Sequence, residues 1–366
     1  MLQRFAVKNF RGFSERIEWD LAKSSGYDFN RYAIKDGIIK NGIIYGPNGS
    51  GKTSFSLALF DIVNHLTQNM RKADYYTNFV YAGNMQLPVE FEYSFRFDKD
   101  IIDYKYSKTA EGRLKDEELL RNGQVVFKKQ GDSVIVNNEY FVYNEAIQEK
   151  LENSVNNVSI VNFILLSYPL EQGHFLLKLQ DFANRMLWFR CLNGNEFIGL
   201  ENHTTALEEY IIKQDLIEDF SDFLNKVSGQ RFDFAKPDTN DKNLFCLING
   251  VKIPFIVIAS TGTQSLLLLY YWMQKIDRSS FVFIDEFDAF YHFRLSFEVC
   301  KRLFSLQGCQ VFTSSHNTYL MTNDLLRPDC NFILNDNKIR PLADCTNKDL
   351  SFANIERLYR GGTFKI

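Results

Sequence analysis

The chain has 366 residues, enough for one large domain or for a domain that carries a sizeable insertion. Apolar residues make up 45% of it, so a substantial core can be buried, and a formal net charge of −3 argues against a globally basic nucleic-acid-binding protein, although not against a local basic patch. The six cysteines form no C-x-x-C pair, so a zinc site has no support in the sequence.

The first part of the chain alternates between apolar and polar residues. Residues 2–10 predict a strand, the apolar run 43–45 predicts a buried strand, and residues 54–66 have the spacing of an amphipathic helix. Period-two alternation then predicts an antiparallel sheet, with strands at 87–97, 101–107, 124–128 and 133–136.

Helical spacing replaces this alternation over residues 143–226, which we interpret as an inserted helical lobe with its clearest helix at 207–224. A hairpin is predicted around the turn Asn249-Gly250. The apolar run 281–284 is typical of a central parallel strand. The remaining predicted elements are strands at 231–234, 243–248, 251–258, 310–313, 332–334 and 338–341 and helices at 263–275, 295–306 and 354–359.

The stretch Gly46-Pro47-Asn48-Gly49-Ser50-Gly51-Lys52-Thr53 fits the pattern G-x-x-x-x-G-K-[ST] at every fixed position. Glycines let the backbone wrap a phosphate chain with its N–H groups pointing inward, and the helix N-terminus adds a partial positive charge. We expect this stretch and Ser54 to bind ATP, with Lys52 at the β and γ phosphates and Thr53 as a ligand of Mg²⁺. A chance glycine-rich turn is the alternative, and the predicted flanking strand and helix argue against it.

The apolar run 281–284 ends in Asp285-Glu286, the pattern of a Walker B strand. Asp285 is predicted to hold Mg²⁺ through water, and Glu286 to orient or deprotonate an attacking water. Acidic loops between strands and helices are common in α/β proteins, so this interpretation depends on the P-loop.

Two further motifs flank this strand. Ser260-Thr261-Gly262-Thr263-Gln264 opens a predicted helix, where Ser260, Gly262 and Thr263 would form a second anion site; a simple N-cap is the alternative. His316 follows the next strand and is predicted to contact the γ-phosphate as a catalytic residue, with an ordinary surface histidine as the alternative.

The order of these motifs resembles that of ABC-type ATPases in the branch of the SMC and RecF heads. More closely, the chain resembles OLD-like bacterial AAA-family ATPases. The matching positions are residues 9–13 for N-F-[RK]-[SG]-[FI], Ser260, Gly262 and Thr263 for S-x-G-T, His292 for a histidine after Walker B, Ser314, Ser315 and His316 for T-[TS]-H with one serine for threonine, and Tyr359, Gly362 and Phe364 for Y-x-x-G-x-[FY].

The resemblance implies an α/β fold: a P-loop NTPase of ABC-ATPase type with an antiparallel β subdomain and an inserted helical lobe. We predict an N-terminal ATPase lobe over 1–142, a helical insertion over 143–228 and a C-terminal ATPase lobe over 229–366. ATP and Mg²⁺ are the implied cofactors. Gln86 is the best candidate for a glutamine loop.

In the resembling ATPases two heads sandwich ATP, and the P-loop of one faces the signature of the other. The implied partner is therefore a second copy of the chain, in a head-to-head dimer or a higher oligomer. Against L-S-G-G-Q, Thr263 replaces a glycine and leaves less room for close backbone approach, which favours a slow, switch-like ATPase.

Three functions compete. Standalone OLD-like ATPases resemble components of the PARIS and Septu anti-phage systems, which implies a sensor or scaffold that controls a separate effector such as a nuclease. A DNA-repair ATPase of RecF or SMC type would bind DNA directly; the scattered positive residues leave nucleic-acid binding open, while no long coiled coil is present. A transporter subunit fits the signature and the large insertion poorly.

The N-terminus lacks the pattern of a secretory signal, and the longest apolar runs, such as residues 266–273, are too short to span a bilayer. We therefore expect a cytoplasmic protein without a membrane segment. Its thiols are expected to be reduced. They belong to Cys191, Cys246, Cys300, Cys309, Cys330 and Cys345.

Overall fold

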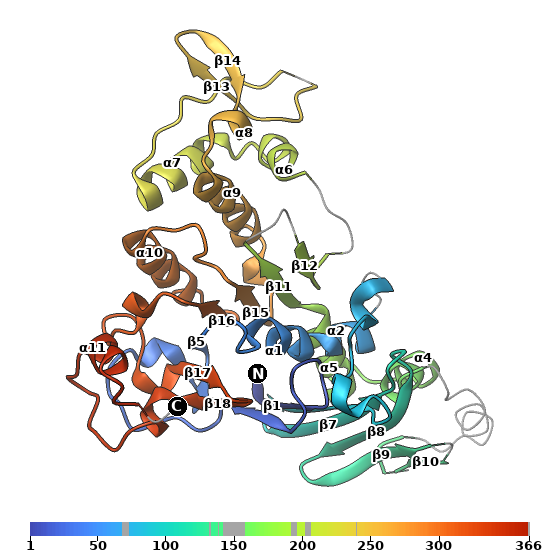
Figure 1. The fold of residues 1–366 in the computed structure, drawn as a ribbon. Coiled ribbons are helices and arrows are strands. Elements are labelled where there is room, and N and C mark those ends of the chain that lie inside the picture. Colours follow the sequence, from blue (N-terminus) through green and yellow to red (C-terminus); the bar gives the residue numbers. More distant parts are fainter. Residues whose placement is uncertain are drawn as a thin grey trace.

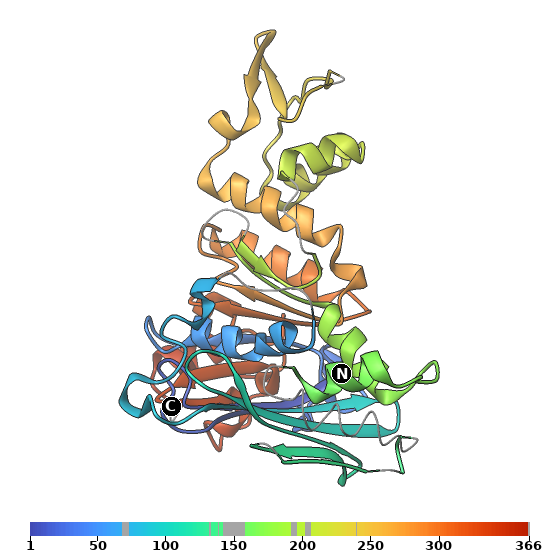
Figure 2. The same cartoon turned by 90° about the vertical axis from the view of Figure 1, so that its right-hand side faces the viewer.

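The structure is a computed structural model that describes residues 1–67, 73–131, 133–137, 139–141, 158–191, 196–201, 206–238 and 240–364. In these residues two seven-stranded sheets lie one above the other, with α1 between them and a helical lobe above (Figures 1 and 2). The predicted α/β class with an attached antiparallel sheet is confirmed. Among the described residues, no helix is both long enough and apolar enough to cross a membrane.

The lower sheet is antiparallel, in the order β10-β9-β8-β7-β6-β1-β2. The predicted strands are confirmed, but the short β2 and the longer β8 were missed. The acidic residues of β8 break the apolar alternation, although Glu117 within it is buried. The strands are β1 Leu2–Lys8, β2 Ile17–Asp20, β6 Val89–Phe97, β7 Asp100–Lys108, β8 Leu114–Arg121, β9 Gln124–Gln130 and β10 Ser133–Val136.

The upper sheet is mixed, in the order β12-β11-β15-β16-β5-β17-β18. Five neighbouring strands run parallel, as predicted for 281–284, and β12 and β18 pair antiparallel at the edges. Its strands are β5 Asn41–Tyr45, β11 Met186–Arg190, β12 Glu196–Ile198, β15 Phe281–Asp285, β16 Gln310–Ser315, β17 Asn331–Asn335 and β18 Lys338–Pro341. A separate pair is formed by β3 Ile34–Lys35 and β4 Ile38–Ile39.

The predicted helix over 54–66 is divided into α1 (Lys52–Leu59) and α2 (Asp61–Leu66). Phe60 interrupts it with φ −89° and ψ 4°, and its ring packs 6.1 Å from that of Phe281. On the opposite side, Phe55 of α1 lies 5.5 Å from the ring of Phe5 and 5.6 Å from that of Trp19. Aromatic packing therefore holds the helix between the two sheets.

The stretch 143–228 is not helical throughout. Its described part contains β11 and β12, which belong to the mixed sheet, beside α4 (Ile160–Ser167) and α5 (Phe175–Asn184). The apolar run of β11 lacks the polar residues of a surface helix because the strand is buried within a sheet. Residues 142–157, 192–195 and 202–205 lie outside the described residues, and the three-part division stays a prediction.

In the upper lobe, three further predicted elements have boundaries that differ from the prediction. A positive φ of 55° at Asp215 splits the predicted helix 207–224 into α6 (Leu207–Lys213) and α7 (Ile217–Ser228). The predicted strand 251–258 ends at Pro254 and continues as α8, and 231–234 retains only a bridge from Phe234 to Cys246. The hairpin turn is confirmed, with positive φ at Asn249 and Gly250. The other elements are β13 Phe245–Ile248, β14 Val251–Pro254, α8 Phe255–Ile258, α9 Thr261–Met273, α10 Phe293–Phe304 and α11 Ile355–Arg360.

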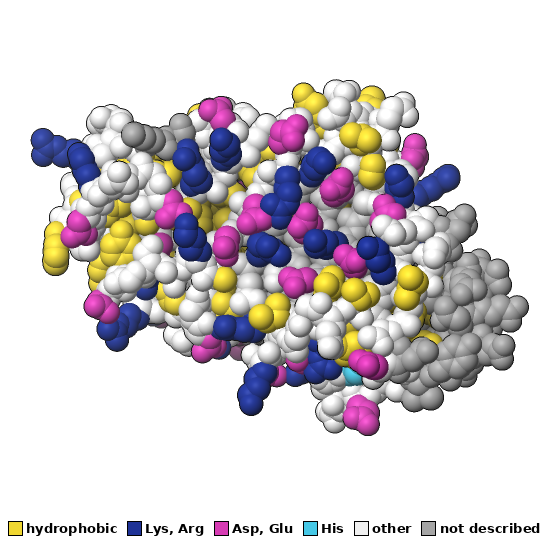
Figure 3. All heavy atoms as spheres, turned by 90° about the horizontal axis from the view of Figure 1, so that it is seen from below, with side chains coloured by type: hydrophobic (Ala, Val, Ile, Leu, Met, Phe, Trp, Pro, Cys, Tyr) yellow, Lys and Arg dark blue, Asp and Glu magenta, His cyan; other side chains and the backbone are white. Residues whose placement is uncertain are grey.

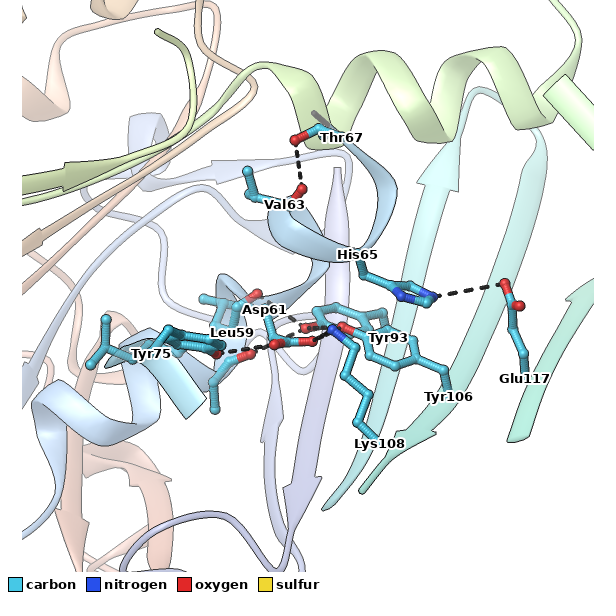
Figure 4. A network of polar contacts seen from close by, with 12 residues as sticks. Leu59, Asp61, Val63, His65, Thr67, Tyr75, Tyr93, Tyr106, Lys108 and Glu117 are labelled. Carbon is cyan, nitrogen blue, oxygen red and sulfur yellow. Dashed lines mark hydrogen bonds and ion pairs between the residues drawn. The ribbon is translucent and has the colours of Figure 1, made fainter. Parts of the chain in front are cut away.

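A buried polar network joins α2 to the antiparallel sheet (Figure 4). Asp61 of α2 accepts hydrogen bonds from Lys108 Nζ at 2.6 Å, from the Tyr106 hydroxyl at 2.9 Å and from the Tyr75 hydroxyl at 3.0 Å. The side chains of Asp61 and Lys108 are 0% and 4% exposed. A charge buried this deeply stays ionised only while its partner is present.

We therefore predict that Lys108→Met lowers the free energy of unfolding by about 3–5 kcal/mol, because it leaves a carboxylate buried without its cation. Urea denaturation followed by circular dichroism measures this. The matched control is Lys105→Met on the same strand, whose exposed ammonium lies 4.0 Å from Glu92 and should contribute less than about 1 kcal/mol. Adding Asp61→Asn to Lys108→Met should recover part of the loss; equal losses in the two lysine variants would contradict the prediction.

Candidate functional site

The P-loop lies between β5 and α1, at the carboxyl edge of the mixed sheet. Gly49 and Gly51 have φ of +78° and +96°, a region that side chains strongly disfavour. A Cβ atom at Gly46 would lie 2.4 Å from the Leu334 carbonyl oxygen, and one at Gly51 would lie 2.8 Å from the Phe13 ring. Glycine is therefore required at these positions, and Phe13 of the N-terminal motif supports the loop from behind.

The interior of the loop is lined by donors. Lys52 Nζ donates to the carbonyl oxygens of Gly46 at 2.8 Å and Pro47 at 3.2 Å, and burial lowers its pKa. Ser50 Oγ is buried and has no hydrogen-bond partner among the described residues. A cationic donor beside a buried, unpaired hydroxyl, within a glycine cradle, suits an anionic phosphate group.

Asp285, at the end of β15, is fully buried and accepts hydrogen bonds from three elements. Thr53 Oγ1 of α1 donates to Oδ2 at 2.8 Å, and Ser314 Oγ of β16 donates to Oδ1 at 2.6 Å. Arg190 of β11 donates to Oδ2 through Nε at 3.2 Å and Nη2 at 3.1 Å. The structure thus brings the two predicted Mg²⁺ ligands, Thr53 and Asp285, into direct contact.

Glu286 follows with a positive φ of 49°, an uncommon conformation for this residue. Its N–H donates to Ser314 Oγ at 2.8 Å, which fixes the turn. Its side chain is half-buried, and burial, followed by the neighbouring Asp285 charge, raises its pKa. A raised pKa favours proton acceptance, as the predicted role requires.

His316 lies beside the P-loop, where it lines a hollow with Gly46, Pro47 and Tyr359. The imidazole is exposed, and its pKa is lowered by partial burial and by the positive charge of Lys52. Tyr359 comes from the C-terminal motif. The structure therefore places His316 and Tyr359 beside the P-loop, and the contact of His316 with the γ-phosphate stays a prediction.

The predicted signature residues lie in a different part of the structure from the P-loop. Ser260 caps α9 by accepting a hydrogen bond from the Thr263 N–H at 3.2 Å, so the N-cap alternative describes its local role. A separate hollow is lined by Ser260, Gly262, Thr263 and His292, and none of the residues that the structure describes lines both this hollow and the one at the P-loop. Figure 1 shows α8 and the start of α9 in the upper lobe, above α1.

Some contacts of the site were missed from sequence, and the glutamine-loop candidate Gln86 stays a prediction. Gln86 is exposed in the loop before β6, and Asn9 secures that loop by donating to the carbonyl oxygens of Asn84, Leu87 and Pro88 at 2.9–3.2 Å. Arg190 was missed because its strand was assigned to the helical lobe. The signal that could have found it is the uninterrupted apolar run 186–189, which resembles the run before Asp285. Ser314 appeared only as a motif match, without its contact to Asp285.

A family model described as "AAA domain, putative AbiEii toxin, Type IV TA system" matches residues 43–322, from the P-loop strand to beyond His316. The chain belongs to this AAA-domain family. The family is a coarser assignment than the predicted OLD-like one. The matched stretch of this chain includes the P-loop, the predicted signature residues 260–264, Asp285 and Glu286.

Solved structures to which the chain is similar include an SMC head bound to the C-terminal winged-helix domain of ScpA, at 15% identity over 93% of this chain and 96% of that one, with a TM-score of 0.46. The SMC head domain from Thermotoga maritima matches at 16% identity over 91% and 94%, with a TM-score of 0.41. The recombination mediator RecF of the RecFOR pathway matches at 13% identity over 94% and 98%, with a TM-score of 0.41. None of the curated proteins matches the chain.

Asp288, three residues beyond Asp285, generates a pH-dependent prediction. Burial raises its pKa to about 6, and its carboxylate accepts a hydrogen bond from Ser315 Oγ at 2.7 Å. Because the folded protein holds this proton more tightly than the unfolded chain, the stabilising contribution is complete below about pH 4 and is lost as the pH rises through about 6.

Asp288→Asn should remove this titration while keeping an acceptor for Ser315. Relative to the parent protein, we expect the variant to gain up to about 3 kcal/mol of unfolding free energy between about pH 4 and pH 7. Urea denaturation at several pH values measures the difference. A difference that stays constant over this range would show that Asp288 titrates normally.

Proposed function

We propose that the chain is an ABC-type ATPase that binds ATP with Mg²⁺ and hydrolyses it slowly. The observation that carries this proposal is the hydrogen bond between Thr53 and Asp285, which joins the P-loop to the Walker B strand at 2.8 Å. Residues 46–54 would hold the phosphates, with Lys52 at the β and γ positions. Thr53 and Asp285 would hold Mg²⁺, which would draw charge from the phosphate oxygens.

The chain's own residues would divide the remaining work. Glu286, with its raised pKa, would accept a proton from the attacking water, and His316 would donate a hydrogen bond to the terminal phosphate. The signature residues Ser260, Gly262 and Thr263 would act on the ATP of a second copy. Their separation from the P-loop hollow within one chain supports this arrangement.

We further propose that nucleotide state makes the protein a sensor or scaffold in bacterial anti-phage defence, as in OLD-like ATPases of the PARIS or Septu kind, with a separate effector such as a nuclease. The family description, which names a toxin of a type IV TA system, favours this role over DNA repair. Figure 3 shows the molecule from below. On this face Lys and Arg side chains are interspersed with Asp and Glu, so the face offers no continuous basic surface for binding DNA. Ion pairs on the antiparallel sheet include Arg16–Glu92, Lys128–Glu118 and Lys8–Glu90.

Glu286→Gln tests the assignment of the general base. The amide keeps the size of the side chain but removes its basicity, so the ATP hydrolysis rate should fall by about 10²–10⁴-fold while ATP binding survives. Phosphate release measures turnover, and calorimetric titration measures affinity. The matched control is Glu171→Gln in the exposed loop before α5, which should retain the parental rate.

If Glu286→Gln hydrolysed ATP at the parental rate and only its melting temperature fell, Glu286 would have a structural role in its turn. If the parent protein bound no ATP in the presence of Mg²⁺, the ATPase proposal itself would be wrong.

A mixing experiment tests whether two copies share each site. Lys52→Ala removes a phosphate contact, and Gly262→Val blocks the signature, because a Cβ there would lie 2.8 Å from the Phe290 carbonyl oxygen. Each variant alone should be inactive. An equal mixture should regain about a quarter of the parental ATPase rate, since half of the random dimers are mixed and one of their two sites carries neither change.

The matched control for the signature variant is Gly308→Val, where a Cβ would make an ordinary contact of 3.6 Å with the Asp277 carbonyl oxygen. This variant should be active alone. A mixture of the Lys52 and Gly262 variants that is as inactive as each variant would contradict the shared site.

A further inference from the structure

Arg190 lies beside the predicted metal ligands although no motif includes it. It is the last residue of β11, and the parallel pairing of β11 with β15 places it opposite Asp285. Trp188 Nε1 donates to Ser56 Oγ of α1 at 2.9 Å, which fixes the strand against the P-loop helix. The position of Arg190 therefore follows from the sheet and from the P-loop helix together.

The hydrogen bonds from Arg190 and Thr53 use up the acceptor capacity of one carboxylate oxygen of Asp285. Oδ2 accepts from Nε and Nη2 of Arg190 and from Thr53 Oγ1, at 3.2, 3.1 and 2.8 Å. A carboxylate offers about four lone-pair sites over its two oxygens. Three donors thus converge on an oxygen with about two such sites, which leaves no free lone pair there for a metal ion or a metal-bound water while Arg190 stays in place.

The positive charge of Arg190 also opposes a metal ion at Oδ2 of Asp285. The guanidinium already balances the buried carboxylate of Asp285, and a divalent cation on the same oxygen would be repelled by it. ATP would change this balance, because its phosphates supply negative charge for both cations. The planar fork of an arginine also fits phosphate oxygens in a bidentate manner.

The surroundings of Arg190 allow it to move. Its side chain is 21% exposed, and its outer side faces Glu196, with Nη1 3.6 Å from Oε2. The guanidinium also lies 5.6 Å from the centre of the Trp188 ring. The Glu196 side chain is 53% exposed and the Trp188 ring is fully buried, so a change of rotamer would give up the contact with an exposed carboxylate while the hydrogen bond of Trp188 to Ser56 holds the ring in place.

We propose that Arg190 covers Oδ2 of Asp285, the oxygen that also contacts Thr53, in the nucleotide-free protein and moves to phosphate oxygens when ATP and the divalent cation bind together. This inference rests on the proposed ATPase function. It makes Arg190 a positioning residue that couples metal binding to ATP binding. A divalent cation alone binds weakly, and each ligand strengthens the binding of the other.

The test compares Arg190→Gln with the parent protein, using Mn²⁺ as the probe and electron paramagnetic resonance to count free Mn²⁺. Without nucleotide, the variant should bind Mn²⁺ at least about tenfold more tightly, because the carboxylate loses its competing cation. In the parent protein, ATP should strengthen Mn²⁺ binding more than it does in the variant, by about tenfold or more, because the variant has lost the coupling through Arg190. Arg185→Gln, which removes an exposed arginine paired with Asp181, is the control and should change neither affinity.

Unchanged Mn²⁺ affinity in Arg190→Gln, together with retained binding of ATP and Mn²⁺, would overturn the role of Arg190 while leaving the ATPase proposal intact. A parent protein that binds no ATP would instead refute the ATPase proposal. Circular dichroism checks folding, since the change leaves Asp285 buried without its cation. If Arg190→Gln does not fold, Arg190→Lys carries the test: its single ammonium cannot cover Oδ2 with two donors, so Mn²⁺ affinity should rise by a few-fold, and no rise would overturn the proposal.

Discussion

The buried carboxylate of Asp285 is the interaction on which the site depends. A fully buried negative charge is costly unless donors surround it, and here the donors come from α1, β11 and β16. The three donors arise in different local settings. Thr53 lies at the start of the P-loop helix, Arg190 is the last residue of β11, and Ser314 is the last residue but one of β16. The carboxylate therefore fixes the carboxyl edge of the mixed sheet and the start of the P-loop helix relative to each other.

Another buried carboxylate, that of Asp61, holds the other side of the same helical segment. Asp61 follows Phe60, where the segment bends, and its cation Lys108 comes from the antiparallel sheet. The P-loop helix is thus fastened to the mixed sheet at its start, and α2 is fastened to the antiparallel sheet just after the bend. Between these two points aromatic packing, as of Phe55 against Phe5 and Trp19, is joined by the hydrogen bond from Trp188 to Ser56.

Sequence predicted the parts of this arrangement that depend on neighbours along the chain. The P-loop, the strand before Asp285, the hairpin at Asn249-Gly250 and most strands of the antiparallel sheet follow from short-range spacing. The contact between Arg190 and Asp285 does not, because it joins residues 95 positions apart through the pairing of β11 with β15. The break at Asp215 was also beyond the pattern, since one residue with positive φ interrupts a helix without changing its apolar spacing.

The hydrogen bonds of Ser260 and Thr263 at the N-terminus of α9 offer a cause for the proposed slow ATP hydrolysis. Thr263 Oγ1 donates to Gln230 Oε1 at 2.8 Å, so in the 2.9 Å contact between Ser260 Oγ and Thr263 Oγ1 the proton must come from Ser260. Ser260 also accepts from the Thr263 N–H. Its hydroxyl is thereby committed as both donor and acceptor within the chain. A phosphate from a second copy would have to break the Ser260–Thr263 contact before it could receive that proton. A glycine in place of Thr263 would have no hydroxyl to compete, which gives the proposed slow hydrolysis a cause in hydrogen bonding as well as in the reduced space for the backbone.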